Sequence, residues 1–382
     1  MSKLLEQLIN ELCPEGVEYI RLKECTEMKR GTSATKKTLS EGQIPVISGG
    51  KEPAFYCDTA NRYGETITIA GSGAGAGYVQ YWNEPIFVND AFSIKVSKNL
   101  NTRYIYHYLL NIQEKIYDTK KGGGGPHVHI SSIENFLVPT PPLPVQEEIV
   151  RILDKFTELT AELTAELTAE LTARKQQYEY YRDNLFVFSD NVLYKPLQEI
   201  ADIGTGSSNT NEELEIGEYP FFVRSQEVRR KDSYEFDEIA IITSGDGVGV
   251  GKIFHYIEGK YALHQRAYRI HINTDDVIPK YYFYYMKSAF LSYIEKNSFH
   301  SSVTSIRRPM LNNFPVPIPY PEDKEKSLAE QQHIVDILDR FDKLCNDISE
   351  GLPAEIEARQ KQYEYYRDKL LTFKKKEATE NE

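Results

Sequence analysis

The chain of 382 residues carries an internal duplication, and this duplication limits the folds open to it. The segment ARKQQYEYYRDNLFVF, from Ala173, returns with few changes as ARQKQYEYYRDKLLTF from Ala358. The same offset of 185 residues relates QEEIVRILDKFTEL, from Gln146, to QQHIVDILDRFDKL from Gln331. Because self-similarity at a fixed period indicates repeated structural units, we expect a block, a helix, a second block and a second helix along the chain.

The duplicated segments have the periodicity of coiled-coil helices. Apolar residues step by 3 and 4 positions in the first copy (Ile149, Ile152, Phe156, Leu159, Leu163) and in the second (Ile334, Ile337, Phe341, Leu344, Ile348). Such steps form the seam of a coiled coil, and an antiparallel pairing of the two helices predicts a pseudo-two-fold symmetric molecule. TAEL repeats run without a break from Glu158 to Ala173, whereas Gly351 and Pro353 predict an interruption in the second helix.

The two blocks have the pattern of mixed α and β structure. Short β-branched or aromatic runs bounded by turn residues (TITIAG, PIFVND, FSIKV, IAIITS, YALHQRAYRIHI) predict strands. Amphipathic helices are expected from Arg103 and from Lys280, with their tyrosines in the core. The predicted fold class is α+β, with two mixed α/β domains separated by two long helices that pair as an antiparallel coiled coil. The predicted boundaries are 1–145 for the first domain, 146–190 for the first helical segment, 191–327 for the second domain and 328–382 for the second helical segment.

The distribution of charge favours two nearly neutral blocks. The net charge of −12 argues against a nucleic-acid partner at first. Counted by segment, 146–190 and 321–382 each have a net charge of −5, whereas 18–145 has +2 and 191–320 has −2, so each block could present a basic face. The sequence contains no apolar run of about 20 residues and its first residues lack a signal-peptide pattern, which predicts a cytoplasmic protein. The four scattered cysteines are expected to be reduced core thiols, with no metal site.

The glycine-rich loops do not support an enzyme. The loop GSGAGAG, from Gly71, has a dinucleotide-like spacing, but a strand-like segment follows it where a phosphate-binding helix should begin. The loop SGDGVGVGKI, from Ser244, resembles a P-loop, but Asp246 replaces its first glycine and Ile253 its magnesium-binding residue. The matched loops fit either a tight hairpin or a close approach to a phosphate backbone. No catalytic constellation is recognisable, so the chain is predicted not to be an enzyme.

Basic and polar loops recur at matching places in both blocks. Arg and Lys recognise guanine edges, Asn and Gln adenine edges, and Lys, Ser and backbone N–H groups bind phosphates. Any one such loop is also ordinary solvated surface, but the recurrence favours a shared DNA-binding face. The candidates in the first block are Lys29, Arg30, Lys36, Lys37, Lys51, Ser72, Asn89, Lys120, Lys121 and His127. Those in the second block are Arg224, Gln226, Ser244, Gln265, Arg266, Arg307 and Arg308.

This layout resembles the specificity subunit of type I restriction-modification systems. The resemblance covers the whole chain and rests on the helix entries PLPVQEEIVRILDKF and SLAEQQHIVDILDRF, the shared KQ-Y-YYRD-L exits and the TAEL units. The TAEL units beside RKQQYEYYRDNL point to the subgroup with variable spacer repeats. The resemblance implies a non-catalytic subunit that reads a bipartite double-stranded DNA site and binds two methyltransferase (M) subunits and restriction (R) subunits, with no membrane. S-adenosylmethionine, ATP and Mg²⁺ are implied in the partner subunits, and no cofactor is bound by this chain.

The helices are expected to carry the docking surface for the M subunits. The candidates are Arg151, Tyr178, Tyr181, Arg182, Tyr363, Tyr366 and Arg367, together with exposed Asp154, Asp336 and Asp339. The alternative is that the tyrosines only complete the internal coiled coil. Two other functions stay open, a stand-alone DNA-modifying enzyme with unrecognised motifs and a coiled-coil scaffold without DNA contact. The number of TAEL units is predicted to set the length of the unread spacer in the DNA site.

Overall fold

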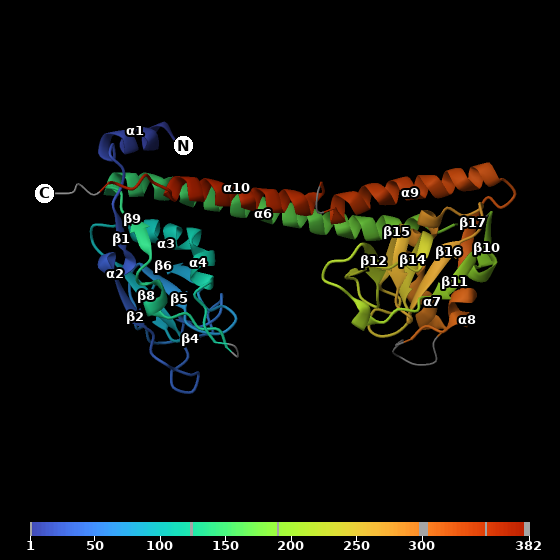
Figure 1. Ribbon diagram of the computed structural model, residues 1–382, viewed down its shortest axis with the longest axis horizontal. Coiled ribbons are helices and arrows are strands. Elements are labelled where there is room, and N and C mark those ends of the chain that lie inside the picture. Colours follow the sequence, from blue (N-terminus) through green and yellow to red (C-terminus); the bar gives the residue numbers. More distant parts are fainter. Residues whose placement is uncertain (1, 123–124, 189–190, 298–304, 348–349, 378–382) are drawn as a thin grey trace. The chain divides into compact units, whose positions relative to one another are not determined.

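The computed structural model describes residues 2–122, 125–188, 191–297, 305–347 and 350–377 (Figure 1). The chain divides into two compact units, Met1–Glu166 with Ile356–Glu382, and Leu167–Glu355. Each unit contains one block and parts of both helical segments. The boundaries predicted from the sequence follow the repeat, whereas these units divide each helical segment between them.

The first unit is built on a four-stranded sheet in the order β2-β8-β5-β6. Its strands are β2 (Thr26–Arg30), β8 (Ala91–Val96), β5 (Thr66–Ala70) and β6 (Val79–Trp82). A second sheet has the order β4 (Phe55–Cys57), β3 (Ile44–Ile47) and β7 (Phe87–Val88), and β1 (Tyr19–Arg21) pairs with β9 (Leu137–Pro139). The helices of this block are α1 (Lys3–Leu12), α2 (Leu22–Cys25), α3 (Thr102–Asn111), α4 (Gln113–Tyr117) and α5 (Ile130–Ile133).

The second unit repeats this plan. Its main sheet has the order β11 (Ala201–Thr205), β16 (Ala267–Ile272), β14 (Phe236–Ser244), β15 (Phe254–Leu263), β12 (Tyr219–Phe222) and β13 (Arg229–Lys231). The strands β10 (Val192–Pro196) and β17 (Pro315–Pro319) pair as β1 and β9 do. The helices are α7 (Pro279–Lys296) and α8 (Arg308–Asn312), with single 3₁₀ turns η1 (Leu197–Glu199) and η2 (Thr210–Glu212). The first four strands of this sheet therefore correspond to β2, β8, β5 and β6.

The first long helix is continuous, and the second is interrupted where the sequence predicts it. Helix α6 (Leu143–Leu185) is continuous over 43 residues and contains every TAEL unit. The second segment divides into α9 (Lys324–Asn346) and α10 (Leu352–Leu371), as Gly351 and Pro353 predicted. A Cβ atom on Gly351 would lie 2.6 Å from the Asp347 carbonyl oxygen, so this close turn requires glycine. Ile348, the last predicted seam residue, lies outside the described residues.

The coiled coil of the predicted fold class is confirmed within each unit. In the first unit the rings of Phe156 on α6 and Tyr366 on α10 lie 5.8 Å apart. In the second unit the rings of Tyr181 on α6 and Phe341 on α9 lie 5.4 Å apart. These two pairs occupy equivalent positions of the 185-residue repeat.

Each long helix carries an apolar stripe that is buried in the core of a block, and Ile149 and Ile334, the first residues of the two predicted seams, belong to this stripe. Val145, Ile149 and Leu153 are fully buried in the core of the first block. Ile334 and Leu338 are likewise fully buried in the core of the second block. One stripe of each helix therefore completes a block, while the seam stripe contacts the other helix. Each long helix therefore contributes residues to the core of a block.

The predicted core tyrosines are buried as expected. Tyr104 on α3 and Tyr281, Tyr282 and Tyr284 on α7 expose at most 1% of their surface. All four cysteines are buried free thiols, and burial raises the pKa of Cys25 to about 11. No helix in the described parts of the chain is both long and apolar enough to cross a membrane.

Candidate nucleic-acid interface

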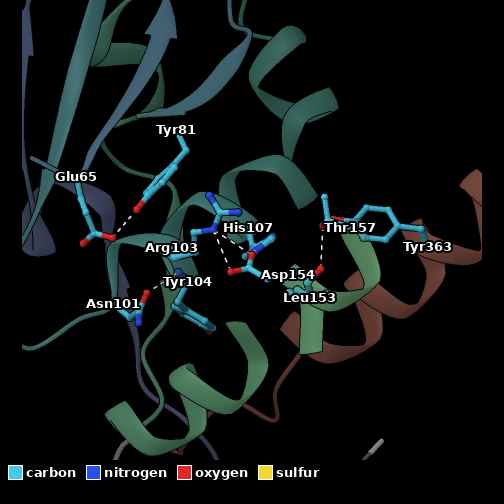
Figure 2. Close-up of polar contacts among 10 residues, drawn as sticks. All are labelled: Glu65, Tyr81, Asn101, Arg103, Tyr104, His107, Leu153, Asp154, Thr157 and Tyr363. Carbon is cyan, nitrogen blue, oxygen red and sulfur yellow. Dashed lines mark hydrogen bonds and ion pairs between the residues drawn. The ribbon is translucent and has the colours of Figure 1, made fainter. Parts of the chain in front are cut away.

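One carboxylate on each long helix fastens a block to that helix, and Figure 2 shows the contact that Asp154 makes in the first unit. Asp154 Oδ1 on α6 lies 3.0 Å from Arg103 Nε and 2.7 Å from His107 Nε2, two α3 residues one helical turn apart. In the second unit, Asp339 on α9 accepts hydrogen bonds from Lys280 Nζ at 2.8 Å and Tyr284 Oη at 2.6 Å, both on α7. The sequence predicts that both aspartates are exposed to a partner subunit, but each carboxylate is bound by its own block and is only 38% or 37% exposed.

A buried glutamine repeats the same attachment. The Gln146 side chain accepts a hydrogen bond from the Asn101 backbone N–H at 2.8 Å and donates to the Pro141 carbonyl at 2.6 Å. Gln331, at the matching position of α9, accepts from the Ile278 N–H at 2.9 Å. Both glutamines are fully buried. Sequence reasoning missed their role, although the Gln at the start of each duplicated segment was the available signal.

The glycine-rich loops are tight connections between adjacent strands. The first joins β5 to β6 and the second joins β14 to β15. Gly73 has φ +78° and Gly247 has φ +83°, a left-handed conformation that favours glycine. Since a strand and not a helix follows each loop, the structure agrees with the rejection of a nucleotide-binding motif. The hairpin interpretation is confirmed, and it is compatible with a loop that approaches DNA.

In the first block, several candidate residues line one polar cavity of about 460 Å³. Arg30, Asn89 and His127 contribute to its wall. Arg30 Nη2 lies 3.1 Å from His129 Nδ1, and the rings of His127 and His129 stack with centroids 6.2 Å apart. The side chain of Asn89 accepts a hydrogen bond from the Ala34 N–H at 2.9 Å. The fold thus brings together three residues that lie far apart in the sequence.

The remaining candidates of the first block are spread over its loops. Lys29 on β2 forms an ion pair of 2.6 Å with Glu27, which offsets its charge. Lys51 and Lys120 lie over the rings of Tyr78 and Tyr117, at 5.3 and 4.0 Å. Exposed positions are found for Lys36, Lys37 and Lys121, and Ser72 donates a hydrogen bond to Asp90.

In the second block, a carboxylate connects two of the predicted arginines. Asp246 lies 2.7 Å from Arg224 Nη1 and 3.2 Å from Arg266 Nη1. Partial burial alone would raise the pKa of the Asp246 carboxyl, but the hydrogen bonds and charges of the two arginines hold the pKa below its usual range. The neighbouring Gln265 donates to the side chain of Asn209. Asp246 was noted in the sequence only as a departure from a P-loop, and its contacts were not foreseen.

Two other candidates in this block have structural roles. Ser244 is fully buried and donates to the Asp246 carbonyl at 2.8 Å, so its prediction as a DNA contact is wrong. Arg308 Nη2 donates to the Ile203 carbonyl at 2.7 Å and so holds α8 on β11. Gln226 and Arg307 are exposed, and Gln226 lines a cavity of about 780 Å³. Of the loop from Ser301 to Arg308, positions 301–304 lie outside the described residues.

The helix candidates separate into exposed and internal groups. Tyr366 and Tyr181 retain 39% and 40% exposure, and Arg151 is exposed beside Glu148. Tyr178 is only 7% exposed and packs on Phe341, so its prediction as part of an exposed docking surface is wrong. The hydroxyls of Tyr363 and Thr157 lie 3.0 Å apart.

The two arginines of this set bind within the chain as well. Arg367 Nε donates to the Asn111 side chain at 3.1 Å. Arg182 pairs with Asp183 and lies 5.9 Å from the centre of the Tyr178 ring. For Tyr178 and Tyr363, the alternative that they complete the internal helix pair is the one the geometry favours.

Comparison with known proteins gives a consistent match along the chain. A family model described as the type I restriction modification DNA specificity domain matches residues 14–173 and again 190–358. The type I restriction enzyme EcoR124I/EcoR124II specificity subunit of Escherichia coli is 34% identical, over 88% of this chain and 94% of that protein. A putative type I restriction enzyme specificity subunit of Haemophilus influenzae is 32% identical, over 87% and 89%.

Solved structures share the fold. The type I restriction-modification S subunit from M. genitalium covers 93% of this chain and 96% of its own, with a TM-score of 0.53 and 17% identity. A chain from a study of complex assembly and conformational transition of the type I R-M system covers 94% and 98%, with a TM-score of 0.62 and 16% identity.

Proposed function

The chain belongs to the type I restriction-modification DNA specificity family, and from that premise we propose that it reads a bipartite DNA site with one block per half-site. The observation that carries this proposal is the repeated block. Both blocks have the same central strand order and glycine hairpins, but they present different side chains at those hairpins. A conserved scaffold with divergent loops suits two readers of different base sequences, since binding residues concentrate on loops held by a rigid scaffold.

The helices are proposed to bind two copies of one methyltransferase subunit. The exposed pairs Phe156–Tyr366 and Phe341–Tyr181 are equivalent in the repeat and equally exposed at their tyrosines. Beside the first pair lies an apolar groove of about 370 Å³, lined also by Arg151 and Ile152. Aromatic and arginine side chains are the residues that most often dominate protein interfaces. Two equivalent surfaces would place two identical partners in equivalent environments.

The chemistry is proposed to reside in the partners. The M subunits would supply S-adenosylmethionine and the R subunits would use ATP and Mg²⁺, while this chain supplies sequence recognition without catalysis in the cytoplasm. Among the described residues, no group of three or more His, Cys, Asp and Glu side chains could hold a metal ion.

The decisive experiment is methylation mapping of the complete complex. The chain assembled with its M subunits should methylate adenines in one bipartite motif with an unread spacer. The purified chain alone should not bind S-adenosylmethionine. Methyl transfer by the chain alone would favour the stand-alone enzyme, and a complex without any sequence-dependent footprint would favour the scaffold.

A further inference from the structure

Backbone hydrogen bonds align three loop positions between the two blocks. The Gly71 N–H donates to the Asp90 carbonyl at 3.1 Å, and the Gly245 N–H donates to the Arg266 carbonyl at 2.9 Å. Since Gly71 matches Gly245, Ser72 matches Asp246 and Asp90 matches Arg266.

The third position is aligned by the neighbouring strands. The Asn89 N–H donates to the Ile47 carbonyl at 2.8 Å, and the His264 N–H donates to the Phe222 carbonyl at 2.9 Å. Two residues beyond these acceptors stand Gly49 and Arg224. The same scaffold therefore carries Gly, Ser and Asp in the first block but Arg, Asp and Arg in the second.

The backbone around the second set is held from several sides. The Ile306 N–H donates to the Gly245 carbonyl at 2.8 Å, and the Ser244 hydroxyl donates to the Asp246 carbonyl. The Arg266 N–H donates to His264 Nδ1 at 3.0 Å, which fixes the turn between β15 and β16. Three loops thus converge where Asp246 meets its two arginines.

Asp246 leaves the greater part of each guanidinium accessible. Its carboxylate accepts hydrogen bonds only from Nη1 of Arg224 and Nη1 of Arg266. Nε and Nη2 of both arginines therefore lie outside this contact. The two arginine side chains are 40% and 61% exposed, whereas that of Asp246 is 26% exposed. Guanine presents two acceptors, O6 and N7, in the major groove, and an arginine binds both with a pair of N–H groups. An arginine already held in place loses less conformational freedom on binding.

We propose that Asp246 is a positioning residue that aims Arg224 and Arg266 at guanine, so that the half-site read by the second block contains a G·C pair. This inference rests on the proposed function and adds a base identity to it. At the matched positions of the first block, Ser72 and Asp90 provide oxygen acceptors and no arginine. That chemistry suits the amino groups of cytosine or adenine, so the two blocks differ in the type of base edge they favour at this place.

The test compares four variants of the chain in the complete complex with its M subunits. The variants are R224A, R266A, D246N and, as a matched control, R230A, an exposed arginine of the same block outside this cluster. The readouts are the methylation motif on random DNA and the ratio of specific to non-specific DNA affinity. R224A or R266A should weaken specific binding about 5- to 150-fold and make one G·C position of that half-site degenerate. R230A should leave the motif unchanged.

D246N separates positioning from simple charge. It removes a negative charge from the face, so non-specific affinity should stay the same or rise, while the guanine preference falls. A surface ion pair without this role would change the motif in no variant, because such pairs contribute little by themselves. Phosphate contacts would instead weaken binding to all sequences equally in the arginine variants.

Three results would overturn the inference. They are a wild-type half-site without any G·C pair, an unchanged motif in both R224A and R266A, and a uniform loss of affinity with the motif intact. Each presupposes that the wild-type complex has a bipartite motif. A wild-type complex with no motif at all would instead refute the proposed function.

Discussion

Asp154 accepts hydrogen bonds from two side chains of α3 with a single carboxylate, and this contact is among the clearest points at which one residue holds two elements together. We predict that D154N lowers the free energy of local opening of α3 by about 1–2 kcal/mol. Hydrogen bonds to charged groups contribute about 1.5–3 kcal/mol, and the effect is reduced here because the Asp154 side chain is 38% exposed to solvent. Hydrogen exchange of the α3 amides would measure the change.

The control lies on the same helix. Glu158 forms an exposed ion pair with Lys155, and exposed pairs contribute little to stability, so E158Q should leave the protection of the α3 amides unchanged. Equal protection of α3 in wild type and D154N would contradict a fastening role for this carboxylate.

His107 makes the same junction sensitive to pH. Burial lowers the pKa of His107 below its ordinary value, and this effect outweighs the hydrogen bond and charge of Asp154, which raise it. The unfolded chain therefore takes up a proton near pH 6.5 while the folded junction does not. The contribution of His107 to the free energy of unfolding of the first unit should be fully present above about pH 6.5. It should be lost progressively as the pH falls below that value.

The second unit supplies an internal comparison for this pH effect. Tyr284 occupies the matching place, and burial raises its pKa further above the physiological range. Between pH 7 and pH 5, the protection of backbone amides against hydrogen exchange, corrected for the pH dependence of the intrinsic rate, should therefore fall more in α3 than in α7. H107Y, which introduces the residue of the matching position, should remove this difference between α3 and α7. If the protection of α3 falls as much in H107Y as in the wild type, the pH effect belongs to other groups.

At the scale of elements, each long helix is used on two faces. One stripe completes the core of a block and the other contacts the second helix, so most of its large apolar residues have a partner within the chain. The tyrosines of the pairs Phe156–Tyr366 and Phe341–Tyr181 are the part of this seam that stays about 40% exposed. This is where we expect the methyltransferase subunits to bind.

We predict that Y366A and Y181A combined weaken assembly with the M subunits at least tenfold, since buried interface tyrosines commonly contribute 2 kcal/mol or more. Gel filtration and light scattering of the mixed subunits would measure it. K361A, an exposed change on α10 within an ion pair to Glu357, is the control. Full assembly of the tyrosine double variant would contradict docking at these pairs.

Charge reversal of Arg182 and Arg367, the two arginines predicted in the docking surface near the ends of the duplicated segments, is a less specific test of docking. Arg367 binds Asn111 and Arg182 binds Asp183, which in turn accepts a hydrogen bond from Ser288 of α7. Reversing these charges would disturb the attachment of the blocks as well as any docking, so a weaker complex would have two explanations.

Much of the element plan could be predicted from the sequence, for identifiable physical reasons. The spacing of apolar residues by 3 and 4 positions predicted the helices, and Gly351 and Pro353 predicted the interruption. The glycine-rich loops indicated hairpins as one of two interpretations. Burial of Ser244 and Tyr178 and the inward use of Asp154 could not be predicted, because each depends on a contact between segments far apart in the chain. A charged or polar residue next to an apolar seam has the same local pattern whether it faces solvent or a neighbouring element.

At the scale of the whole molecule, the continuity of α6 links the two compact units. The division between the units falls between Glu166 and Leu167, within the TAEL repeat, and the helix continues through it. A change in repeat number therefore alters the length of one uninterrupted helix without altering either block. This continuity is our reason for proposing that the number of repeat units sets the length of the DNA spacer.

We predict that deletion of one unit, Thr164–Leu167, shortens the unread spacer by one base pair and leaves both half-sites unchanged. Four residues advance a helix by about 6 Å and rotate it about 40° beyond one turn, whereas one base pair turns DNA by roughly 35° at about 10–10.5 base pairs per turn. The axial advance alone would correspond to nearly two base pairs. A tilt of the helix against the DNA axis can compensate for excess length more easily than for a wrong rotation about the axis. The rotation per unit therefore favours a change of one base pair.

Methylation mapping of the deletion variant in complex with its M subunits would measure the spacer. A variant that keeps the helix length but replaces the unit by four alanines is the control, and it should keep the original spacer because alanine preserves the helix. A deletion variant that keeps the original spacer, or that recognises new bases in either half-site, would show that helix length does not set the distance between the two half-sites. A shorter spacer in the alanine variant would show that the side chains of the unit, rather than its length, carry the effect.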